Sequence, residues 1–333
     1  MLIRSIVSPQ KEENKLELRL FGVLAAVFVL MTVLKPALFP TAGNFSSMMT
    51  QFPEYGVMAI GVSLAMISGG IDLAVVGTAN LAAVTAAKFL VAAVPRGTPA
   101  GEAVLPVLIA LLIALGTGLA AGAISGMLIT LFKIPPILAT LGAGQLYAGA
   151  AIVITAGRPI SGLPALFSNI GNMEIAGLLP LPFLLYVVIA ALTHFMLQKT
   201  SFGIKLFLVG TNAKAALFAG LENKLIILKT YMLSGILSAI AGLIMMARTN
   251  SAKADYGVSY TLQCVLIAVL GGVDSNGGRG SILGVTFAVL ILQFLSSGLN
   301  MFDNLSNFYR DVIWGAVLIA ALIVNWMLAR QKR

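Results

Sequence analysis

Two long apolar segments of this chain meet at a short polar break, Ser68-Gly69-Gly70-Ile71-Asp72. Adjacent glycines weaken a helix, and a carboxylate is costly in the hydrocarbon interior of a membrane. Such a break is tolerated where its backbone is buried in protein or lines a wet cavity. The chain is therefore predicted to be a polytopic membrane protein with a polar path, not a row of inert anchors.

The composition supports an all-α membrane protein of one domain. Of the 333 residues 59% are hydrophobic and 10% are charged, against roughly 25% charged residues in a soluble domain. We predict about ten transmembrane helices in a single transmembrane domain over residues 18–329, with tails at 1–17 and 330–333. The expected spans are 18–38, 47–68, 75–94, 104–132, 136–156, 176–197, 228–248, 260–273, 281–300 and 309–329.

The distribution of basic residues predicts the orientation. With a cytosolic N-terminus, the predicted cytosolic segments hold 14 Lys and Arg and the external segments hold 6, while Lys88 falls within a span. The positive-inside rule then places both termini in the cytosol. The net charge of +9 is explained in this way and does not indicate a nucleic-acid partner.

Several kinds of chemistry are excluded or disfavoured. The single cysteine, Cys264, excludes a disulfide framework and a cysteine-rich metal site. The single histidine, His194, has no evident convergent partners for a metal ion. The chain also lacks the Gly-x-x-x-x-Gly-Lys-Ser/Thr pattern that cradles nucleotide phosphates. We expect no metal and no cofactor bound by this chain.

Two glycine patterns predict close backbone contacts. Gly118, Gly122 and Gly126 recur every fourth residue in the span 104–132, so another helix is expected to approach this face closely. A sequence similar to that of the break recurs at 271–274, where two glycines and an aliphatic residue again precede an aspartate. Related halves are common in transporters, but four residues are a small match.

The segment from Thr200 to Lys229 predicts a short capped helix between two spans. Asn212 is a suitable N-cap, residues 213–219 favour helix, and Gly220 is placed to end it. So short a helix is unstable alone in water and needs a surface. The alternatives are a helix on the membrane surface and a knob that docks on a cytosolic partner.

Several motifs in this chain carry a family resemblance. They are the break at 68–72, Thr140-Leu141-Gly142 after a double proline, Phe202-Gly203, Gly210-Thr211-Asn212, Tyr231-Met232-Leu233-Ser234-Gly235 and Gly277-Gly278-Arg279-Gly280-Ser281. With these motifs in this order, the chain resembles, from about residue 45 to 325, the permeases of ABC sugar importers. The resemblance is to the ribose and autoinducer-2 type, within the branched-chain amino acid permease superfamily.

The resemblance implies a non-catalytic permease of the type II importer fold in the bacterial inner membrane. It implies an external sugar-binding protein, a second permease subunit, and cytosolic ATPases that use ATP and Mg and grip a coupling loop at about 198–228. The implied coupling residues are Asn212, Ala213, Lys214, Ala216, Leu217, Phe218, Gly220 and Glu222. Candidate residues of the path or helix break are Ser68, Gly69, Gly70, Asp72, Thr140 and the Leu299-Asn300 pair.

The alternatives concern coupling, substrate and assembly. An ion-coupled secondary transporter needs an intramembrane carboxylate, and Asp72 is the evident candidate. An intramembrane enzyme is disfavoured because polar groups are sparse. Asp72 itself either caps the broken backbone and pairs with a donor, or lines the sugar path. The loop has Gly210-Thr211-Asn212 where the family often has Gly-Gly-Asn, and such departures leave both the sugar and the choice between homodimer and heterodimer open.

Overall fold

The computed structural model describes residues 9–95, 98–175, 177, 179–302, 312, 315, 316 and 319. The predicted span 309–329 therefore lies mostly outside the described residues, as do residues 1–8 of the N-terminal tail and the whole of the tail 330–333. Within the described part, seven helices are long and apolar enough to cross a membrane. The multi-span helical fold is thus confirmed, and the count of about ten stays a prediction.

The chain forms twelve helices and four very short strands in the part that the structure describes. The helices are α1 (Pro9–Leu34), α2 (Ala42–Ile67), α3 (Val75–Ala93), α4 (Ala100–Thr130), α5 (Pro136–Thr155), α6 (Ala165–Asn172), α7 (Leu181–Lys199), α8 (Ser201–Thr211), α9 (Ala213–Phe218), α10 (Asn223–Thr249), α11 (Tyr260–Leu270) and α12 (Ile282–Leu299). The antiparallel strand pairs are β1 (Ile160–Ser161) with β4 (Ser251–Ala252) and β2 (Glu174–Ile175) with β3 (Leu179–Pro180).

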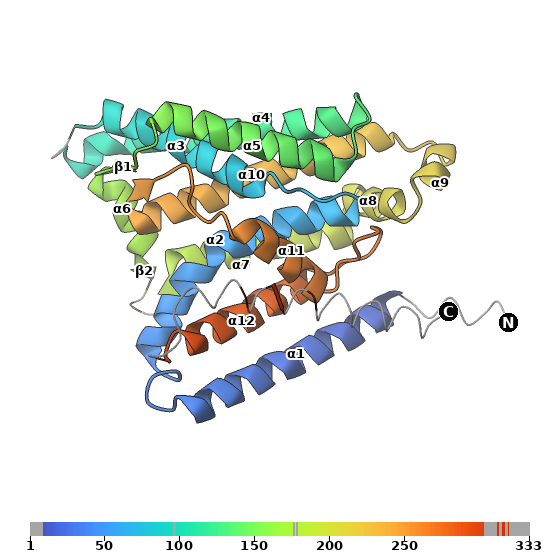
Figure 1. Ribbon diagram of the computed structural model, residues 1–333, viewed down its shortest axis with the longest axis horizontal. Coiled ribbons are helices and arrows are strands. Elements are labelled where there is room, and N and C mark those ends of the chain that lie inside the picture. Colours follow the sequence, from blue (N-terminus) through green and yellow to red (C-terminus); the bar gives the residue numbers. More distant parts are fainter. Residues whose placement is uncertain are drawn as a thin grey trace.

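Helices α2 and α10 form the centre of the bundle. α2 packs against α7, α10, α11 and α12, and α10 packs against α3 and α4 as well. Every residue of α2 from Phe52 to Ile67 is buried, as expected for a largely apolar helix that other helices surround. The long α4 and α5 flank one side, while α1 lies along α12 at the opposite edge (Figure 1).

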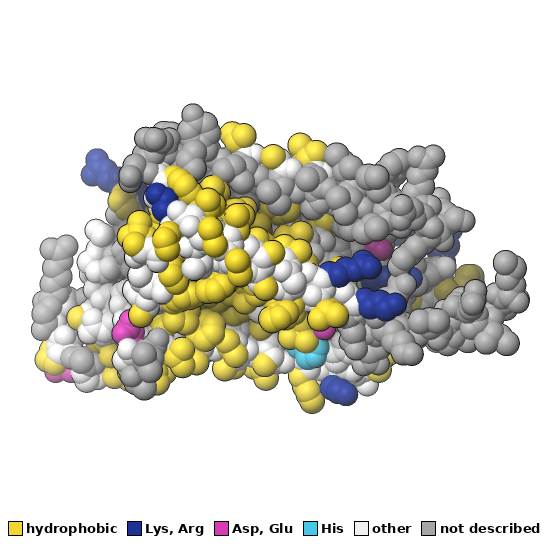
Figure 2. All heavy atoms as spheres, turned by 90° about the horizontal axis from the view of Figure 1, so that it is seen from below, with side chains coloured by type: hydrophobic (Ala, Val, Ile, Leu, Met, Phe, Trp, Pro, Cys, Tyr) yellow, Lys and Arg dark blue, Asp and Glu magenta, His cyan; other side chains and the backbone are white. Residues whose placement is uncertain are grey.

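The outer surface is largely apolar, as a bundle in lipid requires. Figure 2 shows hydrophobic side chains over the middle of one face, with the visible basic side chains towards its ends. On α5, Leu138, Leu146 and Val153 are 61%, 63% and 82% exposed. In water this exposure would be costly, whereas in a membrane these side chains meet lipid tails.

The glycine face of α4 makes the close contact that its spacing predicts. A methyl group at Gly118 would overlap the carbonyl oxygen of Gly235, and one at Gly122 would overlap that of Tyr231. Gly126 continues this contact along α10. Without side chains between them, the two backbones pack directly, which is a common way to join membrane helices.

Two segments expected as tail or loop are helical. α1 begins at Pro9 instead of residue 18, because a proline at the first position and acidic residues in the following turns suit a helix start. α8 occupies the first part of the predicted loop, and the Thr200 hydroxyl caps it by accepting from the Gly203 N–H at 3.4 Å. Its buried Gly203, Leu206 and Val209 follow a helical period that the loop prediction overlooked.

Candidate functional site

The break after α2 is held by the carboxylate of Asp72. Gly69 ends the helix with a left-handed φ of +89°, which glycine adopts without strain. Asp72 is 4% exposed, and its Oδ1 accepts from the Ala74 N–H at 2.9 Å, where α3 begins. Its Oδ2 accepts from the Ser234 hydroxyl of α10 at 2.7 Å. The side chain therefore both caps the broken backbone and joins it to the central helix.

Thr140 of α5 binds the backbone on both sides of Asp72. Its Oγ1 accepts from the Leu73 N–H at 3.1 Å and lies 3.0 Å from the Ile71 carbonyl oxygen. The same hydroxyl lies 2.8 Å from the Pro136 carbonyl oxygen of its own helix. Thr140 is fully buried, so one side chain satisfies backbone groups that have no partner within a helix.

A third polar side chain, Tyr231 of α10, reaches the same place. Its hydroxyl is buried without a hydrogen-bond partner, and a methyl group at Gly70 would overlap it. The second glycine of the break thus makes room for this ring. Among the described residues, no Lys or Arg pairs with Asp72. The site is a small polar cluster of one carboxylate and neutral hydroxyls.

Backbone contacts connect this break to the cytosolic loop predicted from the sequence. The Gly278 N–H donates to the Ile67 carbonyl oxygen at 2.9 Å. A methyl group at Gly210, near the end of α8, would overlap that same oxygen. One at Gly277 would lie 2.8 Å from the Gly69 Cα and 2.9 Å from the Gly210 carbonyl oxygen. We call these meeting segments, 67–69, 210–211 and 277–278, the glycine junction.

The sequence at 271–274, which resembles that of the break, also forms a similar turn after α11. Gly272 ends α11 with φ of +85°, as Gly69 ends α2. Asp72 and Asp274 each accept from the backbone N–H two residues later, at 2.9 Å in both cases, which is an Asx turn. However, the left-handed glycine is the first of its pair after α2 and the second after α11. The matching letters therefore do not superimpose residue by residue.

The structure confirms the short capped helix between α8 and α10. The Asn212 Oδ1 accepts from the Ala215 N–H at 3.0 Å, and α9 spans Ala213–Phe218. Gly220 follows with φ of +81°, and the Asn223 side chain ties α10 to the start of α9 by donating to the Ala213 carbonyl oxygen at 2.6 Å. The local rules for caps and terminating glycines are therefore sufficient to predict where α9 begins and ends.

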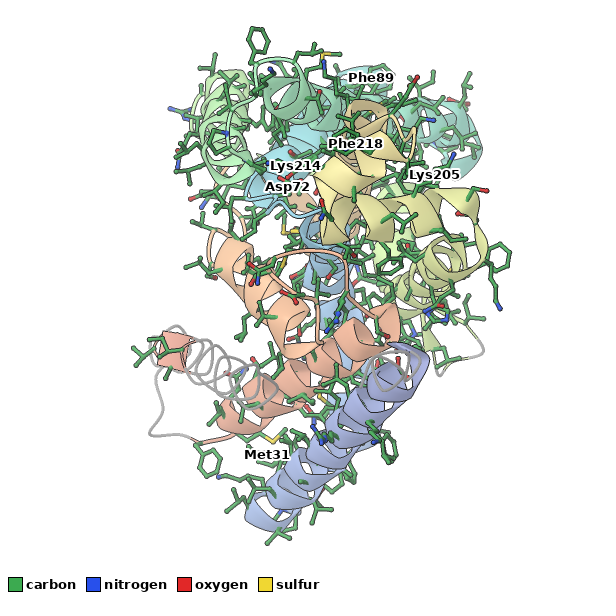
Figure 3. All side chains as sticks on the ribbon, turned by 90° about the vertical axis from the view of Figure 1, so that its right-hand side faces the viewer. Met31, Asp72, Phe89, Lys205, Lys214 and Phe218 are labelled. Atoms are coloured by element: carbon green, nitrogen blue, oxygen red, sulfur yellow. The ribbon has the colours of Figure 1, made fainter. Side chains whose placement is uncertain are left out.

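One face of α9 is exposed and partly apolar. Leu217 is 63% exposed and Phe218 is 91% exposed, while Ala216 on the opposite side is buried. Lys214 and Glu222 are exposed near them. Figure 3 views the molecule from the end at which Figure 1 places α9, and it labels Phe218 and Lys214 on that helix. An exposed aromatic ring and leucine next to charges are a ready contact for another surface.

The other candidate path residues divide into two places. Ser68 is buried at the end of α2, and its hydroxyl donates to the Ala65 carbonyl oxygen at 2.6 Å. Asn300 instead lies exposed at the C-cap of α12, and α12 starts near the break and runs away from it (Figure 1). The structure therefore gathers residues 68–72 with Thr140, but not the Leu299-Asn300 pair.

Sequence reasoning missed a second buried carboxylate, Glu54 in the middle of α2. Arg248 donates two hydrogen bonds from Nη2 at 3.0 Å and one from Nε at 3.2 Å to its carboxylate. The Tyr260 hydroxyl donates to Glu54 at 2.7 Å, and Glu54 is 1% exposed. Arg248, the last residue of the predicted span 228–248, lies in the last turn of α10. The signal that could have revealed this ion pair in the sequence was a carboxylate inside the predicted span 47–68.

No metal centre is evident in the part of the chain that the structure describes, where no three His, Cys, Asp or Glu side chains gather. Cys264 is buried, and its thiol donates to the Tyr55 carbonyl oxygen at 3.4 Å. The polar groups of the bundle are instead used to join helices.

These features define a multi-pass helical membrane protein with a broken central helix and an exposed capped helix connected to the break. The chain belongs to the family of permease components of the branched-chain amino acid transport system, whose model matches residues 44–322. That family is a transport family, and the resemblance noted from the motifs is thereby confirmed.

Named relatives match nearly the whole chain. The ribose import permease protein RbsC of Bacillus subtilis (strain 168) is 35% identical over 304 residues, 91% of this chain and 90% of its own. The protein of the same name from Haemophilus influenzae is 29% identical over 321 residues, 95% of each chain. The autoinducer 2 import system permease protein LsrD of Escherichia coli (strain K12) is 28% identical over 309 residues, 90% of each chain. No solved structure matches.

Proposed function

We propose that this chain is the permease subunit of an ATP-driven importer for a monosaccharide or a sugar-like small molecule. One observation carries the proposal: the similarity to a ribose import permease extends over 91% of the chain at 35% identity. So long a match includes the break, α8, α9 and the loop after α11. The substrate class follows the relatives' names, ribose and autoinducer 2, and leaves the particular sugar open.

The partners follow from what the chain lacks and what it exposes. It has no phosphate-cradling loop, so ATP and Mg belong to a separate ATPase and this subunit is not catalytic. The exposed Leu217 and Phe218 of α9 are the proposed contact with that ATPase. An external binding protein delivers the substrate, and a second permease subunit, identical or related, completes the path. The predicted orientation places α9 in the cytosol of a bacterial cell, below the inner membrane.

The glycine junction supports a route from the ATPase to the path. α9 follows α8 directly, and the end of α8 packs without side chains against the break that holds Asp72. Contacts between backbones resist compression, so movement of α9 shifts the break with it. Asp72 in this proposal positions the broken segment through Ala74 and Ser234, and the neighbouring Tyr231 hydroxyl is free to meet a passing polar solute.

Uptake by reconstituted vesicles tests the proposal. The permease is reconstituted with its ATPase and binding protein, and radiolabelled ribose, other monosaccharides and autoinducer 2 are offered in turn. We expect uptake of one of them to require ATP and the binding protein, and to stop with vanadate. Uptake that persists without the ATPase and follows an imposed ion gradient would show an ion-coupled carrier instead.

A further inference from the structure

A groove of about 360 Å³ opens between α4, α7, α8 and α10, away from the polar cluster at Asp72. It is apolar except for one cation. Its lining residues are Leu119 of α4, Met196 of α7, Phe202 of α8, and Lys229, Met232, Leu233 and Ile236 of α10.

The lining of α10 is polarised along the helix. Its four members stand at i, i+3, i+4 and i+7 and so share one face. Lys229 is the first of them and lies at the end nearest α9, because α10 begins at Asn223. Lys205 follows Phe202 by three residues on α8 and is exposed. An apolar groove thus has one cation, Lys229, towards one end of its α10 side, and a second lysine lies one turn along α8 from Phe202.

This arrangement fits one kind of occupant. A sugar would find no carboxylate, amide or hydroxyl oxygen among the lining side chains, since Lys229 offers only donors. An acyl chain suits the apolar length, and a phosphate suits the lysine. We propose that this groove binds an anionic phospholipid of the cytosolic leaflet, with its headgroup at Lys229 and an acyl chain along Met232, Leu233 and Ile236. The leaflet rests on the orientation under the proposed function, whereas binding itself does not.

A bound lipid at this place would act on the loop that carries α9. Phe202 belongs to α8, which leads into α9 and ends at the glycine junction. A chain between Phe202 and α10 fills space that is otherwise open, and this holds α8 in place. The lipid is therefore inferred to stabilise the part of the permease that faces the ATPase.

Retention of lipid by the purified permease tests this inference. Native mass spectrometry counts bound phosphatidylglycerol and phosphatidylcholine on the permease alone, so the result is independent of uptake. We expect phosphatidylglycerol to be preferred, and Lys229→Gln to weaken its binding about five-fold, the effect of one basic residue near an anionic headgroup. Lys224→Gln, an exposed lysine on the same helix outside the lining, should retain wild-type binding.

The acyl-chain contact has its own variants. Ile236→Trp should fill the groove and displace the lipid, while Leu192→Trp, on an α7 residue that is 63% exposed, should not. Equal binding of both lipids, equal effects of the two lysine variants, or unchanged binding with Ile236→Trp would each overturn the proposal. So would efficient cross-linking of two copies through Leu233→Cys, since the groove would then be a subunit interface.

Discussion

The Ser234 hydroxyl of α10 donates to Oδ2 of Asp72 across a gap of 162 residues in sequence and 2.7 Å in space. Because Oδ1 of the same carboxylate holds the Ala74 N–H, one side chain fixes both the start of α3 and its position on the central helix. Both residues are buried. The broken segment is thus anchored to the element that also carries Tyr231.

Loss of the Ser234 hydroxyl should destabilise the permease. Ser234→Ala leaves a buried carboxylate oxygen without its donor, at a cost of about 1–3 kcal/mol. Ser238→Ala is the matched control, because the Ser238 hydroxyl only donates to the carbonyl of its own helix. Thermal unfolding in nanodiscs measures both.

Asp72→Asn should impair uptake. Expression, stability and uptake at wild-type levels in that variant would show that Asp72 neither positions the break nor serves the path.

Thr140 should be irreplaceable by an isosteric apolar residue. Thr140→Val leaves the Leu73 N–H and the Ile71 carbonyl without this partner, and each unsatisfied buried group costs about 1–3 kcal/mol. Thr140→Ser keeps the hydroxyl and should retain most of the stability. Thr155→Val is a second control, since the Thr155 hydroxyl only contacts carbonyls of its own helix. Equal melting temperatures for Thr140→Val and the wild type would contradict this role.

The features that sequence reasoning predicted depend on neighbours along the chain. Asn212 caps α9 and Gly220 follows it because both effects act within a few residues. The spacing of Gly118 and Gly122 predicted a close helix contact, although it did not identify α10 as the partner. The break at 69–72 was found for the same reason, since glycine and a buried carboxylate are conspicuous in an apolar run.

The features that were missed depend on residues far apart in sequence. Glu54 and Arg248 are 194 residues apart, and nothing near either one shows that the other neutralises it. Residues 67, 210 and 278 meet at the glycine junction because three loops converge, and no periodicity records that. α8 was missed because its helical period was read together with the turn-rich residues that follow it.

A methyl group added at Gly122 should push α4 away from α10, whereas one added at Gly116 of the same helix should not. Gly122→Ala places a Cβ against the Tyr231 carbonyl, whereas Gly116→Ala meets nothing within 4 Å. Overpacking typically costs about 1–3 kcal/mol, while alanine in an open helical position gains up to about 1 kcal/mol. The melting temperatures of the two variants should therefore shift in opposite directions from that of the wild type. A shift of the same size and sign would show that α4 and α10 are not in direct contact.

Removal of the Arg248 charge should be more damaging than removal of the whole pair. Arg248→Met leaves Glu54 buried without its cation, which costs roughly 3–5 kcal/mol for a fully buried pair. The cost should be at or below the lower limit, because the Arg248 side chain is 29% exposed. Adding Glu54→Gln should restore part of the stability. Additive losses in this double-mutant cycle would mean that the two side chains are not coupled.

The final prediction concerns α9 and the ATPase. Helix-in-groove contacts depend on a few apolar anchors, and loss of a central anchor commonly costs 1 kcal/mol or more. Leu217→Asp with Phe218→Asp should therefore weaken co-purification of the ATPase and abolish uptake, while the permease stays folded because both side chains are already exposed. Val258→Asp, at a 67% exposed apolar residue of another loop, controls for the added charge.

The shape of α9 should matter as much as its anchors. Gly220→Val forces a branched residue into φ of +81°, which only glycine adopts readily. Asn212→Ala removes the cap on Ala215, at about 1 kcal/mol. Both changes leave Leu217 and Phe218 in place but loosen the turn that presents them, so ATPase association should weaken without loss of the fold. If the double aspartate variant binds the ATPase at unchanged stoichiometry and transports normally, α9 is not the docking site and the contact lies elsewhere on the cytosolic face.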